Sequence, residues 1–417
     1  MAYYRFPKNK YIKAIFGLLM LGLLLMTRDS MYSMMVWNFY TCQALSLGII
    51  GVMGAAFLVV NRRNLGKILR DRRMLVLLLA TAVMLIPMVV KRDWQLMYFS
   101  ILLGVYFAVF LSYFITLKEL AKWYVVTMSV LGAWSVICSY FLRIFVDNGT
   151  FAVPLVTNSI DILFHNFFLA VVPDTFVKNR NFGIFREPGV YQFFLLMGLY
   201  LNLYVTEWRD QRYFWAVNGI LAVTMVTTFA TGGIIELCLL TVIVFFDKGW
   251  YADKRARIAA LVLVLAVAAF LGGNLALHTG IYYEIRDMVM KFVENPESTG
   301  ARLGSIAVGV ENFFRHPLFG SKVSEVLHAV TDNTSSTLIL YDIFGILGGT
   351  LNVAAWVALV WKRDRRVWAN LALLVVLFLS FNTQNLVWNI FFWLFPMLAL
   401  VERSVPLLKF NGLTKEA

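Results

Sequence analysis

The chain has 417 residues, of which 60% are hydrophobic and only 15% charged. Soluble proteins are about half apolar and about a quarter charged, so this composition excludes a soluble enzyme and a disordered protein. Lysines and arginines number 37 against 24 acidic residues, a formal net charge of +13. In a membrane protein this excess indicates topology, so no nucleic-acid partner is expected. The 3 cysteines exclude a small disulfide scaffold.

Apolar stretches of about 20 residues, the length that crosses a bilayer, follow one another along the chain. We therefore expect an all-α polytopic membrane protein with a single domain over 1–417. About twelve transmembrane helices are predicted, over residues 11–27, 35–60, 74–90, 94–117, 123–146, 189–206, 213–230, 232–246, 257–277, 335–361, 367–381 and 386–402. Thr231-Gly232-Gly233 is predicted to be a tight turn between two of them.

The basic residues predict the orientation of this bundle. With the N-terminus inside the cell, about two thirds of the lysines and arginines fall in cytoplasmic segments, as the positive-inside rule requires. The loops 62–73 and 362–366 carry this bias most clearly. Both termini are therefore predicted to be cytoplasmic. A solvated loop on an anionic leaflet explains these basic inner loops without a ligand.

Two outer loops are long, 147–188 and 278–334, and long loops are uncommon unless they are functional or disordered. Short interfacial helices are predicted in them, at 159–171 and at 302–316. The loops contain all the histidines, namely His165, His278, His316 and His328. Loops are polar in any protein, but arginines on the outer face oppose the orientation rule. They indicate anionic ligands such as phosphate, which guanidinium groups bind in bidentate fashion.

Residues 180–194 read RNFGIFREPGVYQFF, close the first long loop and open a span. Their Arg-x-x-Gly-x-Phe-x-x-Pro pattern resembles the superfamily of O-antigen polymerases and O-antigen ligases. The Phe-Arg-Glu-Pro-Gly-Val-Tyr-Gln version is similar to the polymerases of bacterial surface polysaccharides.

A second segment, 300–348, follows the order of the same superfamily. It contains Gly-Ala-Arg-Leu at 300–303, His-Pro-Leu-Phe-Gly at 316–320, Asp-Asn-Thr at 332–334 and a span with a Gly-x-x-Gly end. Ligases commonly have a His-Asn pair where this chain has Asp332-Asn333, which favours a polymerase. A Ser-Arg pair often found at the hairpin of the middle spans is Thr231-Gly232 here, which argues against a catalytic role for that turn.

The resemblance implies a glycosyltransferase C-type bundle in the bacterial inner membrane, with its active site facing the periplasm. Donor and acceptor would both be undecaprenyl-diphosphate-linked oligosaccharides, and membrane lipid would surround the helices. A chain-length-determining co-polymerase would be a partner. The donor is already activated, so no cofactor is expected. The histidines show no metal-ligand spacing, so no metal is expected.

Candidate site residues follow from the resemblance and from charge. Arg180 and Arg302 are predicted to bind the diphosphate, with Arg186 as a third candidate that an ion pair within the loop explains equally well. A base must accept the proton of the acceptor hydroxyl. For this role Glu187 is ranked first and His328 second.

Further candidates lie close to these residues. Asp332 is a third candidate base, and its neighbour Asn333 is a candidate sugar ligand. Tyr191 and Gln192 follow the motif and are also candidate sugar ligands, although an aromatic residue at a membrane boundary is often only an anchor. Asp342 lies inside a predicted span of the second segment, where an acidic residue is costly and indicates function.

Two other activities fit the same pattern of spans. An O-antigen ligase would use the same donor with lipid A-core as acceptor. A lipid-linked-oligosaccharide flippase or another transporter would be expected to have more charge within its spans, and a repeat of its two halves. The long outer loops and the low intramembrane charge favour the polymerase.

Overall fold

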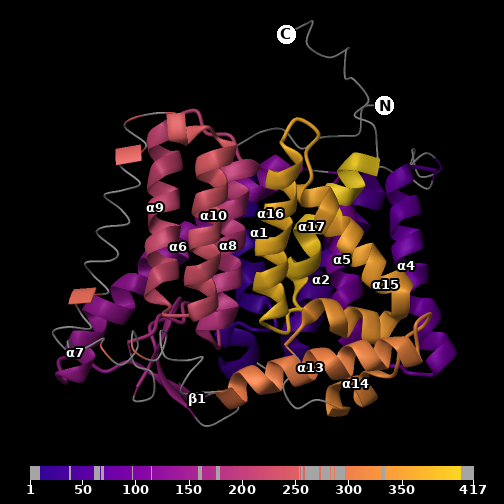
Figure 1. Cartoon of the computed structure of the whole chain (residues 1–417), viewed down its shortest axis with the longest axis horizontal. Coiled ribbons are helices and arrows are strands. Elements are labelled where there is room, and N and C mark those ends of the chain that lie inside the picture. Colours follow the sequence, from indigo (N-terminus) through magenta and orange to yellow (C-terminus); the bar gives the residue numbers. More distant parts are fainter. Residues whose placement is uncertain are drawn as a thin grey trace, which may run out of the picture.

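Long helices run side by side through most of the chain (Figure 1). The computed structural model describes residues 10–36, 39–60, 66, 70–95, 97–113, 115–157, 162–174, 179–252, 254, 257–258, 272–273, 282, 286, 296–329 and 334–404. The long helices are α1 (Lys10–Met26), α2 (Phe39–Val60), α4 (Arg72–Lys91), α5 (Met97–Leu111), α6 (Leu117–Ile137), α8 (Pro188–Tyr204), α9 (Gln211–Thr227), α10 (Thr231–Asp247), α15 (Ser336–Val360), α16 (Val367–Asn382) and α17 (Ile390–Ser404).

Helices occupy every predicted span except 257–277, most of which lies outside the described residues. Within the described chain, 3 helices are long and apolar enough to cross a membrane, namely Arg72–Lys91, Leu117–Asp147 and Ser336–Val360. The second of these continues from α6 through the π-helical turn η3 (Cys138–Leu142) into α7 (Arg143–Asp147). Length and composition are thus those of a membrane protein.

Local sequence explains where several helices begin. Thr116 and Glu119 form a capping box at the start of α6, and the side chain of Asp71 accepts a hydrogen bond from Arg73 N at the start of α4. Pro188 opens α8, at a position where the missing N–H is no loss. The side chains of Thr116 and Asp71 accept hydrogen bonds from backbone N–H groups that have no partner within the first turn of a helix.

One end of the bundle carries the longer connections, with the small sheet, α13 (Pro296–Arg315) and α14 (Val323–Ala329) (Figure 1). We name it the loop-rich end. The opposite end has short connections, held by hydrogen bonds such as Lys362 Nζ to Tyr204 O at 2.6 Å and Leu117 N to Glu402 Oε1 at 2.6 Å. The long connections are therefore at one end of the bundle and the short ones at the other, as the sequence predicted.

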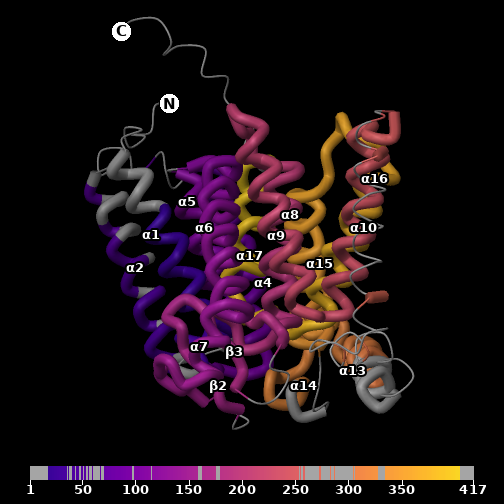
Figure 2. Tube along the Cα trace, turned by 90° about the vertical axis from the view of Figure 1, so that its left-hand side faces the viewer, coloured from indigo at the N-terminus to yellow at the C-terminus, as the bar shows by residue number. Residues whose placement is uncertain are grey.

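The first long loop of this mostly helical chain forms a small antiparallel sheet, so the prediction of a helix over 159–171 is wrong. Its strands are β1 (Leu155–Thr157), β2 (Leu163–Asn166) and β3 (Val171–Pro173), in the order β1-β2-β3. Figure 2 labels β2 and β3 at the loop-rich end, close to α7. Between β2 and β3 the chain reverses at Phe168, whose φ of 68° no helix allows, and Asn166 Oδ1 accepts the Phe168 N–H at 3.0 Å. The apolar residues of two short strands thus gave the pattern from which a single helix was predicted.

The second long loop confirms the helix predicted at 302–316, which begins earlier, at Pro296. This helix, α13, lies across the ends of the bundle helices (Figure 1). It packs on α15, where the rings of Phe313 and Tyr341 meet edge to face with centroids 5.4 Å apart. The short helix α14 follows it.

The predicted span 335–361 is not one continuous helix, because α15 breaks at Gly345. The φ of 64° and ψ of −162° at this residue belong to a region that is essentially open to glycine alone. The backbone groups freed by the break are satisfied by the preceding loop and by Lys91 of α4. Ile346 N donates to Pro317 O at 2.8 Å, and Lys91 Nζ donates to the carbonyls of Ile343 and Ser321.

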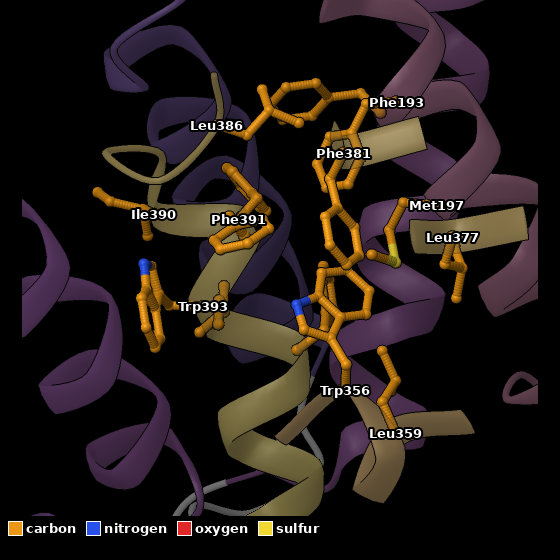
Figure 3. Packing of buried hydrophobic residues seen from close by; sticks show 14 of the residues in the cluster. Phe193, Met197, Trp356, Leu359, Leu377, Phe381, Leu386, Ile390, Phe391 and Trp393 are labelled. Carbon is orange, nitrogen blue, oxygen red and sulfur yellow. The ribbon is translucent and has the colours of Figure 1, made fainter. Parts of the chain in front are cut away.

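Aromatic side chains fill the interior between α8, α15, α16 and α17 (Figure 3). Trp356 is fully buried, and its ring lies 4.7 Å from that of Phe381, measured between centroids. Phe193 and Phe392 complete this cluster. Each such ring pair adds about 0.5–1.5 kcal/mol beyond the burial of apolar area. These ring contacts join α15 to α8, α16 and α17.

Candidate functional site

The segment with the Arg-x-x-Gly-x-Phe-x-x-Pro pattern is attached to the connection between α1 and η1 (Tyr32–Val36). Met31 N donates to Ile184 O at 2.6 Å, and Ser30 and Phe185 form an isolated β-bridge. These backbone contacts fix residues 184–186 at the loop-rich end, immediately before α8.

Arg186 is held by two carboxylates. Its Nε donates to Asp29 Oδ1 at 3.0 Å, and its Nη1 donates to Glu187 Oε1 at 2.7 Å. Burial opposes the charge, but the carboxylates of Asp29 and Glu187 raise the pKa of Arg186 above its ordinary value. The structural ion pair that the sequence left open is present. About 30% of the side chain is still exposed, so Arg186 can also contact a ligand.

Arg180 is half-buried in the same segment. The next residue, Asn181, is fully buried, and its amide donates to Ser135 Oγ at 2.9 Å and to Thr227 Oγ1 at 3.1 Å. Arg180 is therefore anchored through its neighbour to α6 and α9. Because Asn181 fixes the backbone, the position of Arg180 in the loop is well defined.

Arg28 and Asp29 belong to this site and were missed by the sequence analysis. Arg28 lies over the ring of Trp388, 5.9 Å from its centroid. Burial lowers the pKa of Arg28, as does the positive charge of Arg186, while Asp29 opposes the shift. The available signal in the sequence was an Arg-Asp pair directly after the first predicted span.

Glu187, ranked first as the base, is the N-cap residue of α8 and is 44% exposed. Its carboxylate accepts the hydrogen bond from Arg186 and is open to the loop-rich end. Its exposed position leaves the Glu187 carboxylate within reach of a ligand at the loop-rich end.

Tyr191 and Gln192 are core residues, although they were predicted as sugar ligands. The Tyr191 hydroxyl lies 3.1 Å from Ser135 Oγ, and its ring covers Gly183, where a Cβ would approach it to 2.5 Å. Gln192 is 3% exposed and packs against Gly233. Both side chains turn into the bundle because α8 is buried on almost every side.

The predicted turn at 231–233 is also displaced, since Thr231 already begins α10. The chain reverses at residues 228–230, with Phe229 in the left-handed region at a φ of 46°. Gly232 and Gly233 instead leave room for the amide of Gln192. Small residues here serve helix packing, as is common in membrane proteins.

The second segment is described only in part. Arg302 lies on α13 and His328 on α14, but their side chains lie outside the described residues, as do Asp332 and Asn333. Asp342 is 1% exposed and lies between α15 and α13, where a Cβ on Gly309 would come within 3.1 Å of its Oδ2. In this conformation Asp342 does not reach a ligand at the surface.

The two segments meet at the connection between α16 and α17. Gln384 lies against Gly189 at the start of α8, where any side chain on the glycine would overlap its amide. Ser336 Oγ, at the start of α15, donates to Gln384 O at 2.7 Å. The start of α8 and the start of α15 are 148 positions apart in sequence, yet Gln384 contacts both.

His165 pairs with Asp174, with Nε2 2.9 Å from Oδ1, and His316 is exposed. Within the part of the chain that the structure describes, no group of three or more histidine, cysteine, aspartate or glutamate residues is arranged to hold a metal ion. Candidate ligands for anions are therefore the arginines Arg28, Arg180 and Arg186.

No family model, curated protein or solved structure matches this chain.

Proposed function

We propose that this chain is an O-antigen polymerase, a glycosyltransferase of the bacterial inner membrane. One observation carries the proposal. The segment that resembles such polymerases lies at the loop-rich end, contains two arginines, and reaches the start of α15 in the second segment through Gln384. Arginines gathered on the face opposite to the basic short loops are suited to bind an anion.

In the proposed reaction a glycan carried on undecaprenyl diphosphate is transferred to the sugar hydroxyl of a lipid-linked repeat unit. The bond between the anomeric carbon and the diphosphate oxygen breaks, and the acceptor oxygen bonds to that carbon. Undecaprenyl diphosphate leaves with the electron pair. Arg180 and Arg302, with Arg186, would stabilise the negative charge that develops on it.

The proton of the acceptor hydroxyl must pass to a base. Glu187 is the first candidate, since its carboxylate is exposed beside Arg186. His328 and Asp332 are the alternatives. Sugar contacts are proposed for Asn333, which follows Asp332 in the same loop, rather than for the buried Tyr191 and Gln192.

In this proposal the loop-rich end faces the periplasm and the short, basic connections face the cytoplasm, as do both termini. Lipid-linked oligosaccharides are donor and acceptor, and a chain-length-determining co-polymerase is the expected protein partner. The helices that are individually too short to identify as spans cross the membrane as parts of the bundle.

The test is an assay of the purified chain in nanodiscs with a synthetic undecaprenyl-diphosphate repeat unit, a chelator and no nucleotide. A ladder of longer lipid-linked glycans supports the proposal. Transfer that requires added lipid A-core would identify a ligase instead. No transfer in either assay, together with movement of the substrate across a sealed bilayer, would identify a transporter.

A further inference from the structure

Asp29 lies in the connection between α1 and η1, 157 positions before Arg186, and its side chain is only 4% exposed. It contacts Arg186 twice, because its Oδ1 accepts from Arg186 Nε at 3.0 Å and its backbone carbonyl accepts from Arg186 N at 3.0 Å. Its Oδ2 accepts from Asn389 Nδ2 at 3.3 Å. Asp29 is thus fixed from both sides and connects α1, the motif segment and the start of α17.

We propose that Asp29 is a positioning residue, which orients the Arg186 guanidinium toward the diphosphate of the lipid-linked substrate. The inference rests on the proposed function. A guanidinium has five N–H donors in a rigid planar fork. Asp29 holds Nε and Glu187 holds one N–H of Nη1, and within the described residues no other hydrogen bond engages the group. The remaining N–H groups at the Nη1 and Nη2 end are the ones directed to the ligand.

The charges of the cluster support this role. The positive charge of Arg186 acts on Arg28, and Asp29 offsets the positive charge of both arginines. Without Asp29 the two guanidinium groups would move apart, and the flexible Arg186 side chain would lose its fixed orientation. A diphosphate needs both conditions, positive charge at short range and donors in a fixed geometry.

A double-mutant cycle tests whether Asp29 acts through Arg186. The variants are Asp29→Asn, Arg186→Ala and the combination, assayed for kcat and KM with the synthetic repeat unit. We expect Asp29→Asn to lower kcat by about 10- to 100-fold, the range known for residues that orient the ligands of a metal ion. In the Arg186→Ala background the same change should have no further effect. Additive losses, or full activity of Asp29→Asn, would overturn the proposal.

Asp147→Asn is the matched control, since it removes the carboxylate from another arginine at the same end, Arg143, whose Nε lies 3.1 Å from Asp147 Oδ2. It should leave kcat unchanged. Should Asp29→Asn fail to fold, Asp29→Glu keeps the charge but moves the carboxylate by one methylene. It should remain in the membrane and still lose kcat.

Binding of inorganic pyrophosphate, measured by calorimetry on the full chain, separates this inference from the proposed function. If the chain makes no polymer, but pyrophosphate binding is lost equally in Asp29→Asn and Arg186→Ala, the positioning role holds and the polymerase proposal fails. If Asp29→Asn binds pyrophosphate like the unchanged chain, the positioning role is wrong.

Discussion

Gly345 lies directly against the backbone of Leu318, so that a Cβ on the glycine would overlap the Leu318 carbonyl. The contact places the loop 316–321 inside the break of α15. There Ser321 N donates to Asp342 O at 2.6 Å, and Lys91 Nζ binds two carbonyls. The break therefore joins α4, the end of α13 and α15 into one unit at the loop-rich end.

Gly345→Ala should destabilise the fold. The backbone conformation alone costs an L-residue about 1–3 kcal/mol, and the overlap with Leu318 adds to this. Thermal unfolding in detergent should show a lower melting temperature. Gly219→Ala in α9 is the control, because nothing lies within 4 Å of the added methyl and alanine favours the helix. Equal melting temperatures for both variants would show that the loop does not depend on the break.

The sequence predicted structure well where a single physical constraint determines it. A bilayer demands long apolar helices that satisfy their own backbone hydrogen bonds, so the ranges of the helices could be predicted. Caps such as Thr116 with Glu119 are likewise local. The break of α15 was not predicted, because Gly345 resembles any other glycine in an apolar span until the packing of Leu318 is known.

The site depends on contacts between distant segments, so it could be predicted only in part. Local motifs predicted Arg186 and Glu187, but Asp29, the second carboxylate that holds Arg186, is 157 positions from it. Tyr191 and Gln192 were assigned to the ligand because they follow the motif. Their burial follows from the position of α8 among its neighbours, for which the sequence carries no local signal.

Tyr191→Phe should affect stability and not substrate binding. The change removes a buried hydroxyl 3.1 Å from Ser135 Oγ, which costs about 0.5–1.5 kcal/mol for the hydrogen bond. The melting temperature should fall slightly, while KM for the lipid-linked repeat unit stays unchanged. A large rise in KM at an unchanged melting temperature would show instead that Tyr191 contacts the substrate.

Arg180→Ala and Arg302→Ala should each lower the rate of polymer formation by about 100- to 1,000-fold, as the loss of one charge-stabilising donor does. The amount of protein in the membrane should stay unchanged. Arg315→Ala is the control, because Arg315 is exposed on α13 and pairs only with Glu311 among the described residues. Polymer at the ordinary level in a strain that carries Arg180→Ala would rule out its role in binding diphosphate.

Arg186→Lys distinguishes charge from geometry. Lysine keeps the charge but cannot reproduce the planar fork that contacts Asp29 and Glu187 together. If geometry matters, Arg186→Lys should lose as much kcat as Arg186→Ala. A variant with lysine that retains most of its activity would show that positive charge alone suffices.

Two glutamates allow a test of the base. Glu187→Gln should lower kcat by about 100-fold or more, since general-base catalysis contributes about 10²–10⁴-fold. Glu236→Gln should retain activity, because Glu236 is 2% exposed inside the bundle and cannot reach an acceptor hydroxyl. Rates of single transfers at saturating substrate give the comparison. The opposite result, in which only Glu236→Gln is inactive, would identify Glu236 inside the bundle as the proton acceptor.

At the other end of the bundle, the lowered pKa of Lys362 predicts that stability depends on pH. Burial, and secondarily the charge of Arg365, lower its pKa below the ordinary 10.5, while its Nζ donates to Tyr204 O. Between the lowered folded pKa and 10.5 the unfolded chain binds more protons, so the free energy of unfolding rises with pH in this window. Below the folded pKa both states are protonated, and this contribution is constant.

Lys362→Arg isolates the effect, because arginine stays charged throughout this range. Melting temperatures measured from neutral pH to about pH 10, a range just below the ordinary lysine pKa, should therefore rise more steeply for the unchanged chain than for Lys362→Arg. The difference between the two curves belongs to Lys362 alone, since every other titrating group is common to both. Parallel curves would mean that the charge of Lys362 is solvated as well in the folded chain as in the unfolded one.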